Sequence, residues 1–183
     1  MNNFNDCLSK ANDEKLDPFW IAIYEEMFPN IAHISSTIGN KKLQHKGVDR
    51  IITLENNRTI YIDEKLRFTV YPDILLEDIS VLYPNGKEGA TGWMNKDIDI
   101  DYLAYAFKPN KTCYIFPWFP LKRAWKYYRK RWIDKYGYVY APNPGYETAN
   151  VPVPISILKE KIADATKITL PDENPPKNIS NQL

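Results

Sequence analysis

Cysteine and long apolar runs are both scarce in this chain. Only Cys7 and Cys113 occur in 183 residues, which excludes a disulfide framework and a zinc site built from cysteines. No window approaches the roughly 18 consecutive apolar residues of a membrane-spanning helix. The first ten residues, MNNFNDCLSK, also lack the apolar core of a secretory signal. We therefore expect a cytoplasmic protein with no membrane segment.

Net charge is nearly absent as well, because 24 Lys and Arg stand against 23 Asp and Glu, which gives +1 at pH 7. A protein covered all over in nucleic-acid-binding charge would be strongly basic, so any such surface must be local. His33 and His45 are separated by an irregular segment without ligand spacing, which argues against a histidine metal site. Aromatic residues, in contrast, make up 14% of the chain. They either fill a core or form a surface on which bases stack.

The hydrophobic pattern predicts one α+β domain over residues 1–165, with a mainly central sheet. A first helix begins at the Asp17-Pro18 N-cap and has apolar residues at spacings of three and four up to Phe28. Apolar runs bounded by turns predict five strands, over 48–54, 59–66, 74–83, 101–107 and 112–116. Two later helices are predicted over 121–136 and 154–165.

The rest of the chain carries weaker patterns. We expect the first dozen residues to be loose, 31–46 to be irregular, and 137–153 to be a loop with short extended pieces. The tail, residues 166–183, is rich in Pro and Asn, which predicts disorder.

The clearest chemical pattern lies in the predicted hairpin GVDRIITLENNRTIYIDEKLR, residues 47–67. Side chains alternate along a strand, so Asp63 and Lys65 project from one face and Glu64 from the other. Antiparallel pairing brings Asp49 close to Asp63. Two carboxylates and a lysine suit metal-assisted phosphodiester hydrolysis, in which the carboxylates hold Mg²⁺ and the lysine positions or polarises water. The same alternation also describes a solvated strand with cross-strand ion pairs.

This hairpin resembles the PD-(D/E)XK nuclease superfamily. The resemblance consists of a helix, then Gly47-Val48-Asp49 opening a strand, then an apolar strand that runs into Asp63-Glu64-Lys65. The segments DILLEDIS (73–80) and DYLAYAF (101–107) are similar to strands that follow this motif in phage and bacterial members. The resemblance covers roughly residues 18–108, and more loosely the chain up to 162. It implies the restriction-endonuclease-like fold, a central mixed sheet flanked by helices.

The resemblance also implies roles for individual residues. Asp49 and Asp63 would hold Mg²⁺ or Mn²⁺, Lys65 would be the catalytic lysine, and the backbone carbonyl of Glu64 would be a further ligand. The proline that precedes the first acid in many members is missing before Asp49.

A further acid completes the metal site in many members of the superfamily. Glu25 and Glu26 of the first helix are candidates for it, and the helical period does not choose between them; a solvated helix flank is the alternative interpretation. Glu77 lies in an apolar run and either points into the same site or faces solvent.

The predicted helix 121–136 is strongly basic, with seven Lys and Arg residues against the single acid Asp134, a local charge of +6. Five of the basic residues project to one side at about 100° per residue. They are Lys122, Arg123, Lys126, Arg129 and Lys130. Such a flank binds phosphates or is a solvated helix face. Nearby tyrosines either stack on bases or pack in the core; they are Tyr127, Tyr136, Tyr138 and Tyr140.

Together these features predict a Mg²⁺-dependent phosphodiesterase that hydrolyses DNA, as an endonuclease or an exonuclease. The first alternative is a non-catalytic module on the same fold that binds nucleic acid or protein. The second is an interaction protein with an unrelated α+β fold. The sequence leaves the oligomeric state open, a homodimer included.

Overall fold

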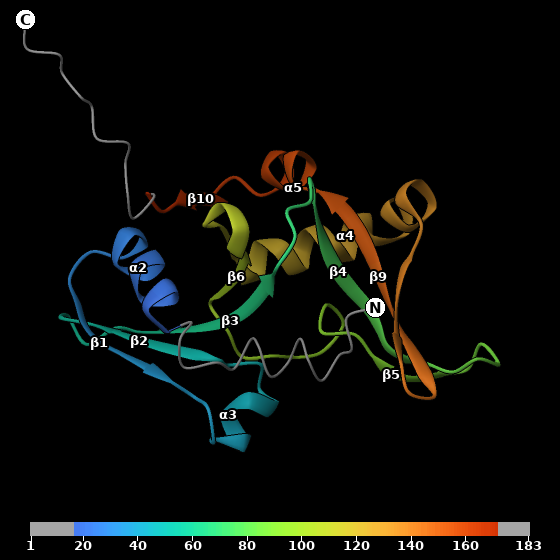
Figure 1. Cartoon of the computed structure of the whole chain (residues 1–183), viewed down its shortest axis with the longest axis horizontal. Coiled ribbons are helices and arrows are strands. Elements are labelled where there is room, and N and C mark those ends of the chain that lie inside the picture. Colours follow the sequence, from blue (N-terminus) through green and yellow to red (C-terminus); the bar gives the residue numbers. More distant parts are fainter. Residues whose placement is uncertain (1–16, 172–183) are drawn as a thin grey trace, which may run out of the picture.

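The computed structural model describes residues 17–171 (Figure 1). Within this range it has ten strands in two sheets and four α-helices, which confirms the predicted α+β class. The first sheet has six strands in the order β1-β2-β3-β6-β7-β10. Their bounds are Ile31–Ser36, Arg50–Leu54, Thr59–Arg67, Tyr102–Phe107, Thr112–Pro117 and Thr166–Thr169. Neighbours are antiparallel except β3 and β6, which are parallel, so this sheet is mixed.

A second sheet is antiparallel throughout, with the order β5-β4-β9-β8. Its strands span Glu88–Thr91, Asp73–Leu82, Tyr146–Pro154 and Val139–Asn143. The six-stranded sheet is the central mixed sheet that the sequence predicts, whereas the second sheet is not predicted. The signal that the prediction misses is the long strand β9, whose alternating apolar residues Val151 and Val153 are fully buried.

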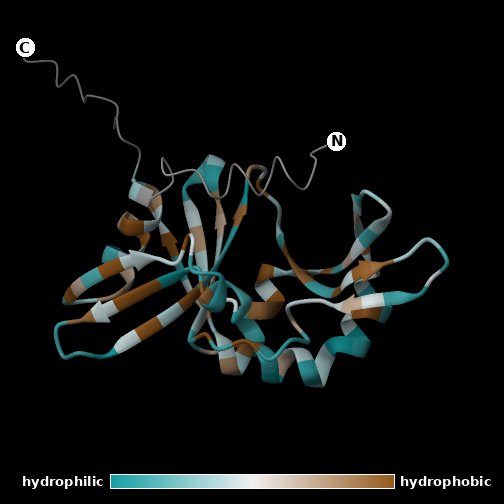
Figure 2. Cartoon of the chain, turned by 90° about the horizontal axis from the view of Figure 1, so that it is seen from below, coloured by the Kyte–Doolittle hydropathy of each residue, from teal (hydrophilic) through white to brown (hydrophobic). Residues whose placement is uncertain are grey.

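The helices divide the interior into two cores. Helix α2 (Asp17–Met27) packs Trp20, Ile23 and Tyr24 against one face of the six-stranded sheet. Helices α4 (Trp118–Tyr136) and α5 (Ile155–Lys161) contribute to the other core, which also contains apolar residues of both sheets. The remaining helix, α3 (Lys41–His45), is short and buries none of its residues. Figure 2 shows that the loop tips are hydrophilic, whereas apolar residues concentrate on the strands.

Two segments inside the predicted domain are more regular than their sequence predicts. Residues 31–36 form the edge strand β1, whose exposed residues give little apolar pattern. Segment 137–153 forms the β8–β9 hairpin instead of a loop. Pro152 and Pro154 weaken the strand pattern of β9, but they lie beyond Asn150, the last residue that pairs with β8, so no strand on that side requires the N–H donor that proline lacks.

The predicted disordered tail also needs a correction. Thr166–Thr169 pairs with β7 as strand β10, and Ile168 is buried in the core beneath α2. Regular structure therefore continues past residue 165. The expectations for the first dozen residues and for residues 172–183 lie outside the described residues. Among the described residues, no helix is long and apolar enough to cross a membrane.

Candidate functional site

The hairpin of β2 and β3 sets two carboxylates side by side. Its register pairs Arg50 with Ile62, so one further step places Asp49 opposite Asp63 on the same face of the sheet. The backbone N–H of Glu64 donates to Asp49 Oδ2 at 2.9 Å. Gly47 turns the chain into this strand with φ 77°, a conformation that strains any residue with a side chain. The predicted pairing of Asp49 and Asp63 is therefore present.

Thr37, which follows β1, fixes the backbone beside Asp49. Its hydroxyl donates to Val48 O at 2.6 Å, and its N–H donates to Asp49 O at 3.0 Å. Thr37 is buried, so these bonds are shielded from water. Sequence reasoning missed this residue, because it lies in a segment with no regular pattern.

Asp63 is only 3% exposed. Burial raises the pKa of its carboxyl to about 7, and the neighbouring Asp49 carboxylate contributes in the same direction. Lys65 Nζ donates to Asp63 Oδ1, and this contact opposes the rise. Burial alone would lower the pKa of Lys65, but the charges of Asp63 and Asp49 outweigh it and raise that pKa. Lys65 is therefore protonated at neutral pH.

Glu77 and Trp93 border this cluster. The N–H of Trp93 donates to Glu77 Oε1 at 3.3 Å, and Lys65 Nζ lies 5.7 Å from the centroid of the Trp93 ring. The charge of Glu77 also acts on the pKa of Lys65. Of the two interpretations of Glu77, the structure supports the one in which it points toward the site. Trp93 is a site residue that sequence reasoning missed.

The side chain of Glu64 lies on the opposite face of the hairpin. Glu64 Oε1 accepts from Arg50 Nε at 2.9 Å and from the Tyr24 hydroxyl at 2.7 Å. Burial raises the pKa of Glu64, although Arg50 and Tyr24 act against the rise. A side chain held in this way is part of the core beneath α2. Any contribution of Glu64 to a metal site is therefore confined to its backbone, as the resemblance implies.

Neither Glu25 nor Glu26 joins the cluster. Both are exposed on α2, and α2 covers the face of the sheet that carries Glu64. Asp63 and Lys65 project from the other face. Of the two interpretations of these helix acids, the structure supports the solvated helix flank, because the sheet separates both side chains from the cluster.

The donor set for a metal ion is small. Over residues 17–171, no three or more His, Cys, Asp or Glu side chains are grouped so that they could hold a metal ion. His33 and His45 are both exposed and lie on β1 and α3. The pair Asp49 and Asp63 fits a cation, because a positive ion between the two carboxylates would favour the charged form of Asp63, which burial and the charge of Asp49 disfavour. Oxygen ligands of this kind suit Mg²⁺ or Mn²⁺.

Two of the five basic residues predicted to bind nucleic acid have partners inside the protein. Lys122 Nζ donates to the carbonyl oxygens of Met94 and Lys96 at 2.8 and 2.9 Å. Arg129 forms two bonds of 2.7 and 2.8 Å with the carboxylate of Asp78. Their partners are distant in the sequence, so the helical period alone does not reveal these contacts. The other three, Arg123, Lys126 and Lys130, are exposed.

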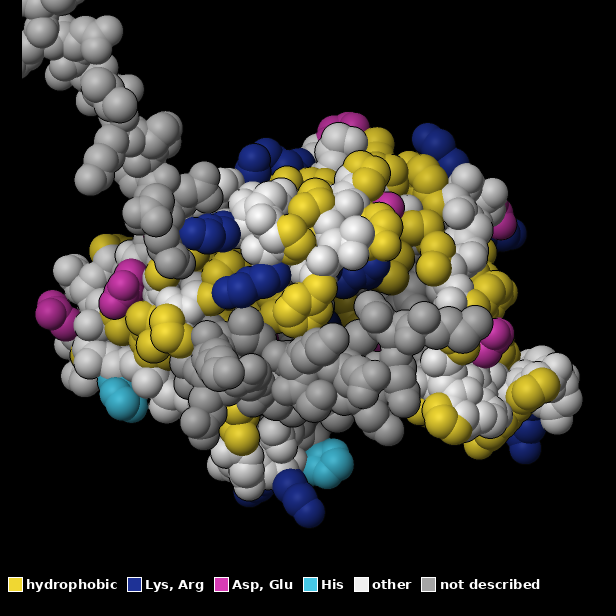
Figure 3. Space-filling view, viewed as in Figure 1, with side chains coloured by type: hydrophobic (Ala, Val, Ile, Leu, Met, Phe, Trp, Pro, Cys, Tyr) yellow, Lys and Arg dark blue, Asp and Glu magenta, His cyan; other side chains and the backbone are white. Residues whose placement is uncertain are grey.

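Basic side chains do not merge into one surface on the face that Figure 3 shows. There the Lys and Arg side chains lie separately, among hydrophobic and other side chains. This distribution agrees with the net charge of +1. Binding of an anion on this face would therefore depend on a few cations placed beside apolar groups.

Asp78 is the centre of a second polar cluster. It is 1% exposed and, besides Arg129, also accepts from the Tyr138 hydroxyl and from Asn95 Nδ2. Burial acts to raise its pKa, but the bonds from Arg129, Tyr138 and Asn95 outweigh burial and lower the pKa. The cluster joins β4 to α4 and to the start of β8. We assign it to stability, because Arg129, Tyr138 and Asn95 together satisfy the buried carboxylate of Asp78.

Comparisons of this chain with protein-family models, with curated proteins and with solved structures find no match. The resemblance to PD-(D/E)XK nucleases therefore stays a prediction, based on the hairpin residues. The function of the site is therefore inferred from the chemistry of its residues.

Proposed function

We propose that this chain is a divalent-metal-dependent phosphodiesterase that hydrolyses DNA. Asp49 and Asp63 are the metal ligands in this proposal, and Lys65 acts beside them. The observation that supports it best is the pairing of Asp49 with a buried Asp63 whose pKa is raised to about 7, with the Lys65 ammonium in contact. Burying a carboxylate next to a second one is costly for stability alone, and such arrangements are concentrated at functional sites.

Each residue has a defined role in the proposed reaction. A bound Mg²⁺ or Mn²⁺ would supply an activated water and neutralise charge on the phosphate. Asp49 is held by the N–H of Glu64, so its carboxylate is oriented before any ligand arrives. The protonated Lys65 can donate a hydrogen bond to a phosphate oxygen or to the attacking water. Trp93, against Lys65, limits the access of bulk water to that side of the ammonium.

The test is cleavage of labelled DNA and RNA, single-stranded and duplex, by the full chain with Mg²⁺ or Mn²⁺. Asp63→Asn should abolish cleavage, since an amide is a poor ligand for a hard cation. Lys65→Met should lower the rate by about 10²–10³-fold or more while Mn²⁺ binding persists. Asp99→Asn is the matched control, because Asp99 also pairs with a lysine, Lys46, but has a side chain that is 74% exposed.

A non-catalytic module that binds nucleic acid or protein is the alternative. The small donor set favours it, since no group of three metal-ligating side chains occurs among the described residues. If the chain with Mg²⁺ or Mn²⁺ cuts no nucleic acid, and calorimetry detects no Mn²⁺ binding that depends on Asp49 and Asp63, this alternative replaces the nuclease proposal.

A further inference from the structure

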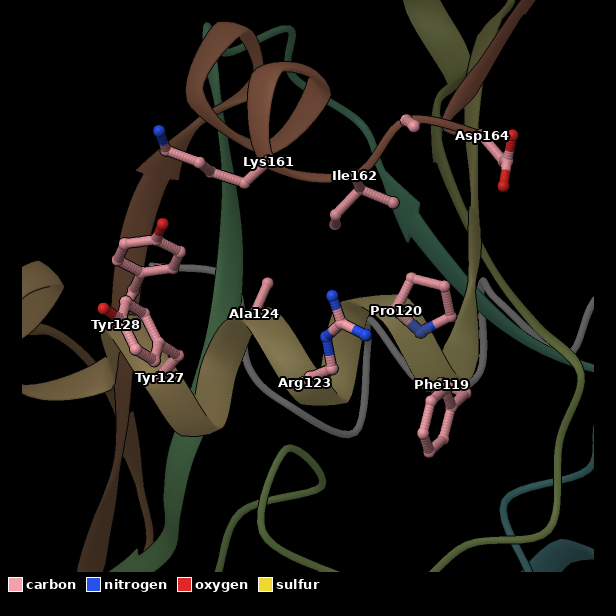
Figure 4. Close-up of a pocket in the computed structure, with 10 residues that line it drawn as sticks. Phe119, Pro120, Arg123, Ala124, Tyr127, Tyr128, Lys161, Ile162 and Asp164 are labelled. Carbon is pink, nitrogen blue, oxygen red and sulfur yellow. The ribbon is translucent and has the colours of Figure 1, made fainter.

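A second concave surface lies on α4, apart from the carboxylate cluster. It is a groove of about 640 Å³ between α4 and the segment from Lys161 to Asp164, which begins at the last residue of α5 (Figure 4). Figure 4 shows Arg123 projecting from α4 toward the side of the groove that carries Ile162. Three aromatic residues, Phe119, Tyr127 and Tyr128, line the groove together with the cations Arg123 and Lys161. Asp164 is the one acid in the lining.

Two aromatic rings in this groove are strongly exposed. Phe119 is 75% exposed and Tyr127 is 69% exposed, the highest values among the exposed large hydrophobic residues of the described chain. An exposed apolar ring gains nothing from the core, and several together on one surface mark an interaction site. Such rings are suited to stack on a flat ligand.

Cations alternate with these rings along the helix. Phe119, Arg123, Tyr127 and Arg131 follow one another at intervals of four residues, so they form one row on the surface of α4. The guanidinium of Arg131 lies 5.7 Å from the centroid of the Tyr127 ring. At 1.5 Å of rise per residue, the two rings are separated by about 12 Å along the axis, with Arg123 between them. The spacing leaves room for a separate planar group on each ring.

The charge of the groove selects the ligand. Lys161 Nζ lies 5.5 Å from the Tyr128 ring centroid and also pairs with Glu160 at 2.6 Å, so Arg123 is the lining cation that best suits an anionic ligand. Arg131 lies outside the groove lining, one turn further along the same row of α4. A second copy of the chain would place this basic row against itself, which like charges oppose. A ligand with regularly spaced anionic groups and flat rings would match the arginines and the exposed aromatic rings of this row.

We propose that this groove binds unpaired nucleotides of a nucleic-acid strand. Bases stack on Phe119 and Tyr127, the phosphate between these rings contacts Arg123, and the phosphate that follows Tyr127 contacts Arg131, one helical turn further along α4. A duplex does not fit this mode, because its bases are stacked on one another and present no free faces. The inference rests on the proposed function and narrows its substrate to strands that contain unpaired nucleotides.

The first residue of α4, which is buried and lies outside the groove lining, packs toward the candidate site. Trp118, which precedes Phe119, has its ring centroid 6.2 Å from that of Trp93. The Trp93 ring in turn lies 5.7 Å from Lys65 Nζ.

The test is fluorescence anisotropy of a labelled 12-nucleotide oligothymidine in EDTA, where no cleavage occurs. The variant with Phe119→Ala and Tyr127→Ala should bind about 5–150-fold more weakly for each stacked base lost, with an unchanged salt slope. Arg123→Gln should flatten the log–log salt slope by about 0.7, the value for one phosphate of a single strand. Tyr83→Ala, which removes a ring that is 43% exposed just beyond the end of β4, is the matched control and should bind like the wild type.

Equal binding by the double ring variant would overturn the inference, as would a preference for duplex of the same length. Competition by polyglutamate as effective as competition by oligothymidine would also overturn it, because the groove would then select charge alone. Thermal melts of the variants should match the wild type, since the altered side chains are exposed. The metal-site proposal and the groove proposal can fail independently. Asp63→Asn should keep oligothymidine binding, and the double ring variant should keep Mn²⁺ binding at Asp49 and Asp63.

Discussion

Replacing Asp63 by Asn should make the metal-free protein more stable at pH 8 and leave it nearly unchanged at pH 4. In the folded protein the pKa of Asp63 is about 7, against an ordinary value of 3.8. Between these values the folded protein keeps a proton that the unfolded chain has released, so rising pH favours unfolding. The wild type therefore has this stability in full below pH 3.8 and loses it as the pH rises to about 7.

The size of the effect follows from the pKa difference. About three pH units, at about 1.4 kcal/mol per unit, give about 4 kcal/mol as the upper bound on the gain at pH 8. The amide oxygen of the substituted side chain can still accept from Lys65, so the variant should stay folded. Urea unfolding at pH 4 and pH 8 in EDTA measures the difference. Excess Mg²⁺ should narrow the difference at pH 8, because only the wild type gains stability from the ion.

A difference between variant and wild type that is the same at both pH values would refute this reasoning, since it would mean that Asp63 ionises without cost. The control is again Asp99→Asn, whose exposed ion pair with Lys46 should change stability by less than about 1 kcal/mol at either pH.

The other predictions concern the surroundings of the site. Glu64→Gln removes the carboxylate that forms the buried ion pair with Arg50. It should lower the free energy of unfolding, measured in urea, by about 3–5 kcal/mol. Asp78→Asn should cost a similar amount at pH 7, and the deficit should shrink below about pH 4, because the lowered pKa stabilises the folded wild type only while Asp78 is ionised. Changing both Lys126 and Lys130 to Gln should flatten the salt slope of oligothymidine binding by about 1.4 without altering the melting temperature; an unchanged slope would show that this flank is only solvated.

The strands that the sequence predicts correctly are those with a local signal. The hairpin of β2 and β3 has strong apolar alternation and a four-residue turn, and β6 and β7 flank a turn with Pro109. Strands β1, β8 and β10 lack such a signal, and prolines interrupt the apolar alternation of β9. They form because a neighbour supplies the missing hydrogen bonds, as β7 does for Thr166–Thr169. Pairing between distant segments is not visible in a single sequence.

The site shows the same division. Asp49, Asp63 and Lys65 could be placed together from strand alternation and hairpin pairing alone. The role of Glu77 could not, since it depends on how β4 of the second sheet packs beside β3. Likewise, the helical period places Lys122 and Arg129 on one flank of α4, but their partners come from residues 94–96 and from Asp78. The predictions that the structure corrects are those that depend on contacts between elements distant in the sequence.

The two faces of the β2–β3 hairpin explain why this carboxylate pair is held in register. Asp49 and Asp63 lie on one face, while Arg50 and Glu64, their immediate neighbours in sequence, pair on the other face at 2.9 Å. A shift of either strand by one residue would carry an acid of the site into the apolar core beneath α2 and bring a member of the buried pair out of it. Both changes would leave buried charges without their partners, which is strongly destabilising. The buried Arg50–Glu64 pair thus opposes the slips that would separate Asp49 from Asp63, and it gives the hairpin a physical reason to keep the candidate metal ligands together.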